Sequence, residues 1–131
     1  MNSPSLKEFQ DQVSELLLRH RSLLDVLSKC NQANASVHRS VIKSVTECGC
    51  IEVHAEKQRY SEQPDLQEAM GLMQQHIHGK LCDTCKEAVS AELGKNFFYI
   101  SALCNLLSID METVIDEESR KCSTLGLFNL S

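Results

Sequence analysis

Two close pairs of cysteines constrain this chain more than any other feature of its sequence. Cys48 and Cys50 flank a single glycine in TECGCIEV, and Cys82 and Cys85 form a CxxC in KLCDTCKEA. Each pair already places two sulfur atoms near one another, so two pairs can supply the four ligands of a tetrahedral metal ion. If both pairs bind one ion, the chain must fold so that Cys50 and Cys82 lie close together.

The expected redox compartment favours a metal site over disulfides. The chain of 131 residues starts with the polar MNSPSLKEFQDQ, which lacks the apolar stretch of a signal peptide. No apolar run approaches the roughly 18 residues that cross a bilayer. We therefore expect a cytoplasmic protein without membrane contact. In a reducing cytosol, seven cysteines indicate metal binding or buried thiols, and the odd count agrees with this.

Composition narrows the fold and the class of partner. Lys and Arg number 13 against 18 Asp and Glu, and no basic block occurs, so we expect no binding to nucleic acid. Only two prolines, five glycines and 5% aromatic residues favour helices over a β-sandwich rich in turns. We predict one all-α domain over residues 1–131, a helical bundle of four to five helices with a metal-clipped loop between helices.

Apolar residues at helical spacing predict the first half of this bundle. The SLKE at 5–8 fits a capping box, which starts a first helix that ends near Cys30. A second helix continues from there to the glycine of the CGC. The segment IEVHAEKQRY alternates apolar and polar residues and could be a short extended piece, but we expect an ordered loop because no partner strand is evident.

The second half contains three further predicted helices. Pro64 lies near the start of a third helix, which Gly79 would end. The fourth helix starts at the CxxC and has the strongest amphipathic pattern in the chain, and a short fifth helix starts near Ser108 or Asp110. We expect the apolar tail LGLFNL to dock on the core or on a partner subunit. The apolar stripe of the third helix comprises Leu66, Met70, Met73 and Ile77.

These considerations predict a structural Zn²⁺ site. Thiolate charge is favoured where the CxxC enters a helix N-terminus, and the central glycine lets the CxC fold tightly. An iron–sulfur cluster would accept the same ligands, and four unrelated thiols remain an alternative. A thioredoxin-like redox pair is disfavoured because no βαβ pattern surrounds the CxxC. The predicted metal ligands are Cys48, Cys50, Cys82 and Cys85.

Other potential ligands are weaker candidates. His54 follows Cys50 by four residues and could replace one thiolate. His76 and His78 stand at i and i+2, which point in different directions on a helix. The remaining thiols are expected to be a core residue (Cys104) or to lie near helix ends without ligand neighbours (Cys30 and Cys122).

The stretch CKEAVSAELGKNFFYISALCNLLSIDMETVIDEE, residues 85–118, resembles the second half of the MazG-like all-α nucleotide pyrophosphohydrolase domain. The matching pattern is an acidic-rich helix followed by a short turn, and SLKEFQDQVSEL is similar to the family's opening helix. The combination of SVTECGCI, CDTC and STLGLFNL is similar to small bacterial MazG-like proteins. The resemblance implies a MazG-like helical bundle that assembles through its helices as a homo-oligomer. The matching residues are Glu92-Leu93, Phe98-Tyr99, Leu103 and Ser108-Ile109-Asp110.

The acids on which that family's chemistry depends are mostly replaced. Family members hold Mg²⁺ beside the triphosphate with four acids, in an ExxE and a later ExxD arrangement. Glu92 matches one of them, Lys95 stands in place of its partner, and Glu47 is the only carboxylate of the preceding helix. We therefore predict a divergent member without catalytic residues, in which Glu92 is the only weak candidate.

Three functions follow from these patterns. The first is a non-catalytic helical protein with a structural Cys₄ zinc site, which acts through oligomerisation or protein contacts. The second is a Mg²⁺-dependent pyrophosphohydrolase that binds a nucleoside triphosphate and releases the monophosphate and pyrophosphate. It would use divergent acids such as Glu87, Glu92, Asp110 and Glu117. The third is a thiol or metal sensor whose cysteine pairs bind metal or oxidise reversibly.

Overall fold

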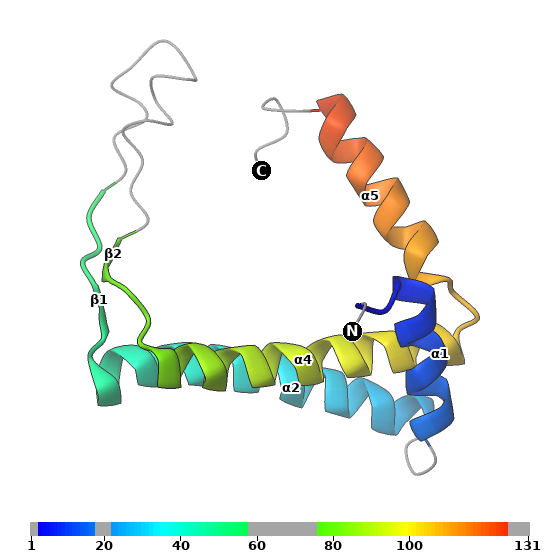
Figure 1. Cartoon of the computed structure of the whole chain (residues 1–131), viewed down its shortest axis with the longest axis horizontal. Helices are drawn as coiled ribbons and strands as arrows, with labels where there is room; N and C mark the ends of the chain where they lie inside the picture. Colours follow the sequence, from blue (N-terminus) through cyan, green and yellow to red (C-terminus); the bar gives the residue numbers. More distant parts are fainter. Residues whose placement is uncertain (1–2, 18–21, 58–75, 126–131) are drawn as a thin grey trace. The chain divides into compact units, whose positions relative to one another are not determined.

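The computed structural model describes residues 3–17, 22–57 and 76–125, which are mostly helical and include a small two-stranded sheet (Figure 1). The expected helical class is therefore confirmed in outline, but the sheet was not expected. The chain divides into two compact units. We call Met1–Ser36 with Glu92–Ser131 the terminal unit, and Val37–Ala91 the central unit.

The first helix of the terminal unit starts as the capping box predicts and ends earlier than expected. Helix α1 spans Leu6–Leu16, and the Ser5 hydroxyl oxygen accepts the backbone N–H of Glu8 at 3.1 Å. Helix α2 spans Leu23–Lys43, so the predicted single helix to Cys30 is wrong and Cys30 lies inside α2.

Core packing explains this difference in helix boundaries. Val13 and Val26 are buried in the same apolar cluster. One straight helix would hold these two residues about 20 Å apart along its axis. The two residues therefore cannot belong to one straight helix. No Gly or Pro interrupts the residues around Cys30, so α2 continues through that position.

A buried glutamine joins both ends of the terminal unit. The Gln10 side chain is 8% exposed, donates through Nε2 to the Ile109 carbonyl at 2.8 Å, and accepts the Met111 N–H at 3.0 Å. Helix α5 spans Met111–Leu125 and begins where the sequence predicts. The core of this unit comprises Val13, Leu17, Val26 and Ala102, with Phe9, Cys30, Phe98, Leu103 and Leu106 packed against it.

The central unit contains the sheet. After α2 the chain forms a π-helical turn, η1, over Ser44–Cys48. Strand β1, Ile51–Val53, then pairs antiparallel with β2, Ile77–Gly79, so that Ile51 lies opposite Gly79 (Figure 1). The predicted loop at residues 51–53 and the predicted helical ending at Ile77–Gly79 are both wrong. Each segment pairs with the other, and a short window of sequence around either one does not contain its partner strand.

Helix α4, Asp83–Leu106, starts at the CxxC as predicted and contributes residues to both units. Residues 64–75 of the predicted third helix, and residues 126–130 of the apolar tail, lie outside the described part of the chain. Within that part, no single helix is long and apolar enough to cross a membrane. Helices α4 and α5 together are long and apolar enough, but they are bent by 109° at the break between them.

Candidate metal centre

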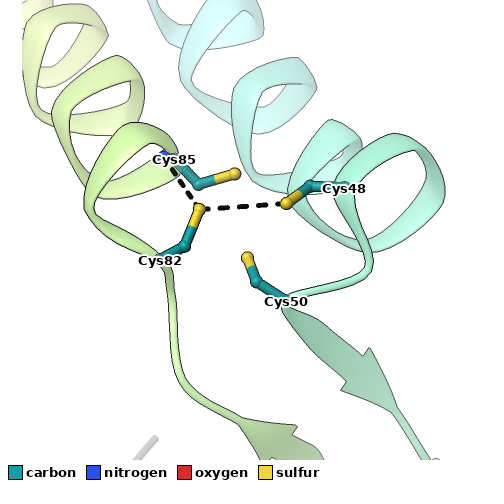
Figure 2. A group of neighbouring side chains, drawn as sticks. All are labelled: Cys48, Cys50, Cys82 and Cys85. Carbon is teal, nitrogen blue, oxygen red and sulfur yellow. Dashed lines mark hydrogen bonds between the residues drawn. The ribbon is translucent and has the colours of Figure 1, made fainter.

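The four predicted ligands converge at one place in the central unit. Their sulfur atoms all lie within 4.8 Å of one another, and their side chains point toward a common centre (Figure 2). Cys48 ends the π-helical turn, Cys50 immediately precedes β1, and the CxxC stands at the start of α4. Among the described residues, this is the group of three or more potential ligands that could hold a metal ion.

The CxxC half of the site is formed by helix capping. Cys82 directly precedes α4, and its Sγ accepts the backbone N–H of Cys85 at 3.4 Å. This is the bond that a Ser or Asp side chain makes at a helix N-cap with the third helical residue. The spacing therefore orients both sulfurs on the same side of the first turn, where the helix dipole favours negative charge.

The CxC half depends on the widened turn. The N–H of Gly49 donates to the Ser44 carbonyl at 2.9 Å and closes the π-helical turn. Gly49 itself adopts the left-handed conformation, with φ 78° and ψ 10°, which a glycine reaches without steric cost. The chain reverses there, so Cys48 before the glycine and Cys50 after it face the same point (Figure 2).

The two-stranded sheet brings the halves together. Ile51, next to Cys50, is 7% exposed and pairs with Gly79, three residues before Cys82. Gly79 has a φ of +94°, and a Cβ at this position would lie 2.6 Å from the carbonyl oxygen of Cys50. Close approach of the strands at this end therefore requires a glycine.

Electrostatics differ among the thiols of the cluster. The backbone N–H of Cys85, together with the other thiols, lowers the pKa of Cys82 to about 7. A hydrogen bond with Ser44 acts to lower the pKa of Cys85, but its thiol neighbours outweigh this bond, with Cys82 foremost, and raise it to about 12. Near neutral pH, Cys82 is therefore partly ionised while Cys85 keeps its proton, and a metal ion that binds Cys85 must displace that proton.

The spacing of the sulfurs fits one tetrahedral ion. The Sγ atoms of Cys48 and Cys82 are 3.8 Å apart. A Zn–S bond of about 2.3 Å gives a tetrahedral S–S edge of about 3.8 Å. A disulfide would require about 2.05 Å, and these cysteines are free thiols.

The remaining cysteines lie apart from this cluster. Cys30 is not near a helix end as expected: its Sγ donates to the Tyr99 carbonyl at 3.4 Å, and burial raises the pKa of its thiol. Cys104 is half-buried, and burial raises its thiol pKa too. Cys122 is exposed on α5.

The histidines near the site make other contacts. The ring of His54 pairs with the Glu52 carboxylate at 2.9 Å, and its centroid lies 4.3 Å from that of His78. His76 precedes β2 and its Nε2 lies 3.0 Å from the Glu56 carbonyl. The converging group itself consists of the four cysteines, without the predicted minor ligand His54.

The candidate acids lie in ordinary helical surroundings. Glu92, on α4 in the terminal unit, is 3.4 Å from the Lys95 ammonium, and both line a polar hollow of about 220 Å³. The Asp110 carboxylate accepts the Thr113 hydroxyl at 2.8 Å, as expected of a residue that precedes a helix. Glu87 and Glu117 are exposed on α4 and α5.

Two residues that support the site were not identified from the sequence. Ser44 is 1% exposed, its hydroxyl donates to the Ser40 carbonyl at 3.2 Å, and its own carbonyl closes the turn before Cys48. Nothing in the sequence distinguishes it from other helical serines. Gly79 was assigned to a helix end, and only the pairing of the strands reveals its role.

Comparisons of the chain with protein families, with curated proteins and with solved structures find no match.

Proposed function

We propose that Cys48, Cys50, Cys82 and Cys85 bind one structural Zn²⁺ ion in a non-catalytic cytoplasmic protein that acts through oligomerisation or other protein contacts. The observation that carries this proposal is the convergence of four sulfurs, from two separate segments, within 4.8 Å. Thiolates in tetrahedral sets of four are the ligands of closed structural zinc sites.

The compactness of the cluster supports a single ion. In a four-iron cluster each thiolate binds a different iron, and in a two-iron cluster the thiolates bind in pairs to two irons. A four-iron cluster separates all four sulfurs more widely than one ion does, and a two-iron cluster separates the two pairs from each other. All four sulfurs here lie within 4.8 Å, which agrees with one ion.

The composition of the central unit explains why an ion would be needed. Its buried apolar side chains among the described residues are Ile51 and Val89. So small an apolar core supplies little hydrophobic stabilisation, and small folds of this kind use a metal ion as an additional tie. Zinc bound only to the folded state contributes its binding free energy to folding.

The metal content of purified protein tests this proposal. We expect about one zinc per chain, and a cobalt-substituted sample should show the thiolate charge-transfer bands of tetrahedral coordination. The double variant Cys82→Ser/Cys85→Ser should lose the metal and melt at a lower temperature. Cys122→Ser should keep the metal and the melting temperature of the wild type. Protein without metal, iron in place of zinc, or unchanged melting of the double variant would contradict a structural zinc site.

The exposure of Cys48 favours a thiol or metal sensor as the second candidate function. A ligand open to solvent can be attacked by an oxidant or a chelator without unfolding of the site. Zinc release by hydrogen peroxide, followed with a chelating dye, measures this. Release within minutes and recovery after reduction would favour sensing, and a metal that resists peroxide while the protein stays folded would favour a structural role.

The relationship to MazG-like proteins belongs to this proposal and rests on the pattern of residues 85–118. If the protein were a MazG-like pyrophosphohydrolase, Glu92 would have to bind Mg²⁺, although its carboxylate is 3.4 Å from the competing Lys95 ammonium. Release of pyrophosphate from nucleoside triphosphates in the presence of Mg²⁺ is the direct assay. Activity that Glu92→Gln abolishes would refute the non-catalytic assignment.

A further inference from the structure

An open apolar groove crosses the terminal unit, separate from the cysteine cluster. Residues of α1, α4 and α5, with Pro4 and Ser5, line this groove, which has a volume of about 470 Å³. No charged residue lines it. Its walls include Leu6, Phe9, Phe97, Ile100, Val114 and Ile115.

Two residues of the apolar stripe predicted for α4, Phe97 and Ile100, line this groove, although α4 is less amphipathic than α1, α2 or α5. The buried side of α4 carries Ser101 and Ala102, both 0% exposed. Phe97 of the stripe is instead 54% exposed, and Val114 and Ile115 on α5 are 49% and 45% exposed. A contiguous apolar surface of this kind on a folded protein marks a binding site.

Acidic side chains lie beside several residues that line the groove. The Glu8 carboxylate accepts the hydroxyl of Ser5, a groove residue, at 3.2 Å. Asp110 lies close enough to Cys104, another lining residue, to raise its pKa together with burial. Glu118 follows Val114 by one helical turn on α5, where its carboxylate is 3.7 Å from the Lys121 ammonium. In all, α1 and α5 carry seven acidic residues against three basic ones.

We propose that this groove binds an amphipathic helix of a partner protein, whose apolar face enters the groove and whose Lys or Arg residues meet the acidic rim. Helix-in-groove recognition uses apolar side chains at i, i+3, i+4 and i+7. A second copy of this chain would bring the same acidic rim against the first, and an anionic membrane or nucleic acid would be repelled. The charge around the groove therefore selects a basic helix.

This inference deepens the proposed role in protein contacts and rests on that role, but it is independent of the zinc site. The groove is built only from the terminal unit, whereas the cysteines belong to the central unit. Zinc content measured on the same samples therefore separates a failure of the groove from a failure of the metal site.

A designed peptide tests the groove. The probe is a fluorescein-labelled helix of about 14 residues with Leu at the apolar positions and Lys elsewhere, and its matched control has Glu in place of Lys. The zinc-loaded full chain should raise the fluorescence anisotropy of the Lys peptide only. Phe97→Asn and Ile115→Asn should each weaken this binding by about tenfold or more.

Matched variants identify the surface. Leu24 is 75% exposed on α2 and does not line the groove, so Leu24→Asn should bind as the wild type does. Glu8→Gln/Glu118→Gln should weaken binding and reduce its salt dependence. Circular dichroism confirms folding of each variant.

Three results would overturn the proposal. The Glu peptide could bind as tightly as the Lys peptide, or Leu24→Asn could weaken binding as much as Ile115→Asn does. Alternatively, sedimentation could show that the wild type self-associates and that Ile115→Asn abolishes this association, in which case the groove is an interface between copies of this chain.

Discussion

Replacement of Gly79 by alanine should weaken zinc binding although residue 79 is not a ligand. The added Cβ would lie 2.6 Å from the Cys50 carbonyl oxygen, and real contacts of this kind require one side to move by several tenths of an ångström. A non-glycine residue at a φ of +94° adds a backbone cost of about 1–3 kcal/mol. Relief of the contact moves Cys50 away from the other three sulfurs.

The combined cost is about 2–4 kcal/mol, taking about 1 kcal/mol for the displaced backbone. If half of this cost, about 1–2 kcal/mol, acts on the bound state, zinc affinity falls by about 5- to 30-fold, since about 1.4 kcal/mol corresponds to a factor of ten. Competition with a chromophoric chelator measures the affinity directly.

Two other glycines separate the contact from the backbone strain. Gly49 also has a positive φ, +78°, but a Cβ there meets no atom within 4 Å, so Gly49→Ala carries only the conformational cost of about 1–2 kcal/mol. Gly94 lies inside α4 with open space around it, and Gly94→Ala should leave zinc binding unchanged. Equal zinc affinities of the Gly79→Ala and Gly49→Ala proteins would refute the role assigned to the close strand contact.

Three further predictions concern the thiols and the terminal core. In metal-free protein at pH 7.5, iodoacetamide should modify Cys82 before Cys85, because a pKa of about 7 leaves Cys82 mostly as thiolate and a pKa of about 12 leaves Cys85 protonated. Peptide mass spectrometry identifies the order of modification, and the reverse order would contradict these pKa shifts. Zinc affinity should fall as pH falls, and more steeply below pH 7. Cys85 must lose a proton at any neutral pH, and Cys82 must also lose one once the pH drops below its pKa. Calorimetry in buffers of different ionisation enthalpy counts the protons released. Gln10→Ala should lower the free energy of unfolding by about 1–3 kcal/mol, because it leaves the Met111 N–H without its partner. Substitution of the exposed Gln12 by alanine should change this free energy little. Urea unfolding compares the two variants, and equal losses would refute the role assigned to the Gln10 hydrogen bonds.

Local signals in the sequence predicted the elements that local physics forms. The SLKE capping box starts α1, and the CxxC coincides with the N-cap and third residue of α4. In both cases the stabilising bond joins residues three apart, so a short window contains all of the relevant atoms.

Pairing over long separations was not predictable in the same way. Strands β1 and β2 are three residues each, and neither has enough length or alternation to be identified alone. The same limit applies to the helix predicted to end near Cys30: Val13 and Val26 are buried in one cluster, so they belong to two helices, and no local pattern contains this contact. Periodicity also indicates an apolar side of α4 without revealing that part of this side, at Phe97, stays open.

The division into two units leads to a final prediction about the reach of the metal. The cysteine cluster lies in the central unit, where Ile51 and Val89 are the buried apolar residues of the described chain, while the terminal unit has its own core around Val26 and Ala102. Removal of zinc by a chelator should therefore raise amide hydrogen exchange at Ile51 and Val89 far more than at Val26 and Ala102, because local opening follows the loss of local stabilisation. Mass spectrometry of exchanged peptides, or NMR, resolves the four positions in wild type and in Cys82→Ser/Cys85→Ser. Equal loss of protection at all four would mean that the units unfold together, and the groove would then depend on the ion as well.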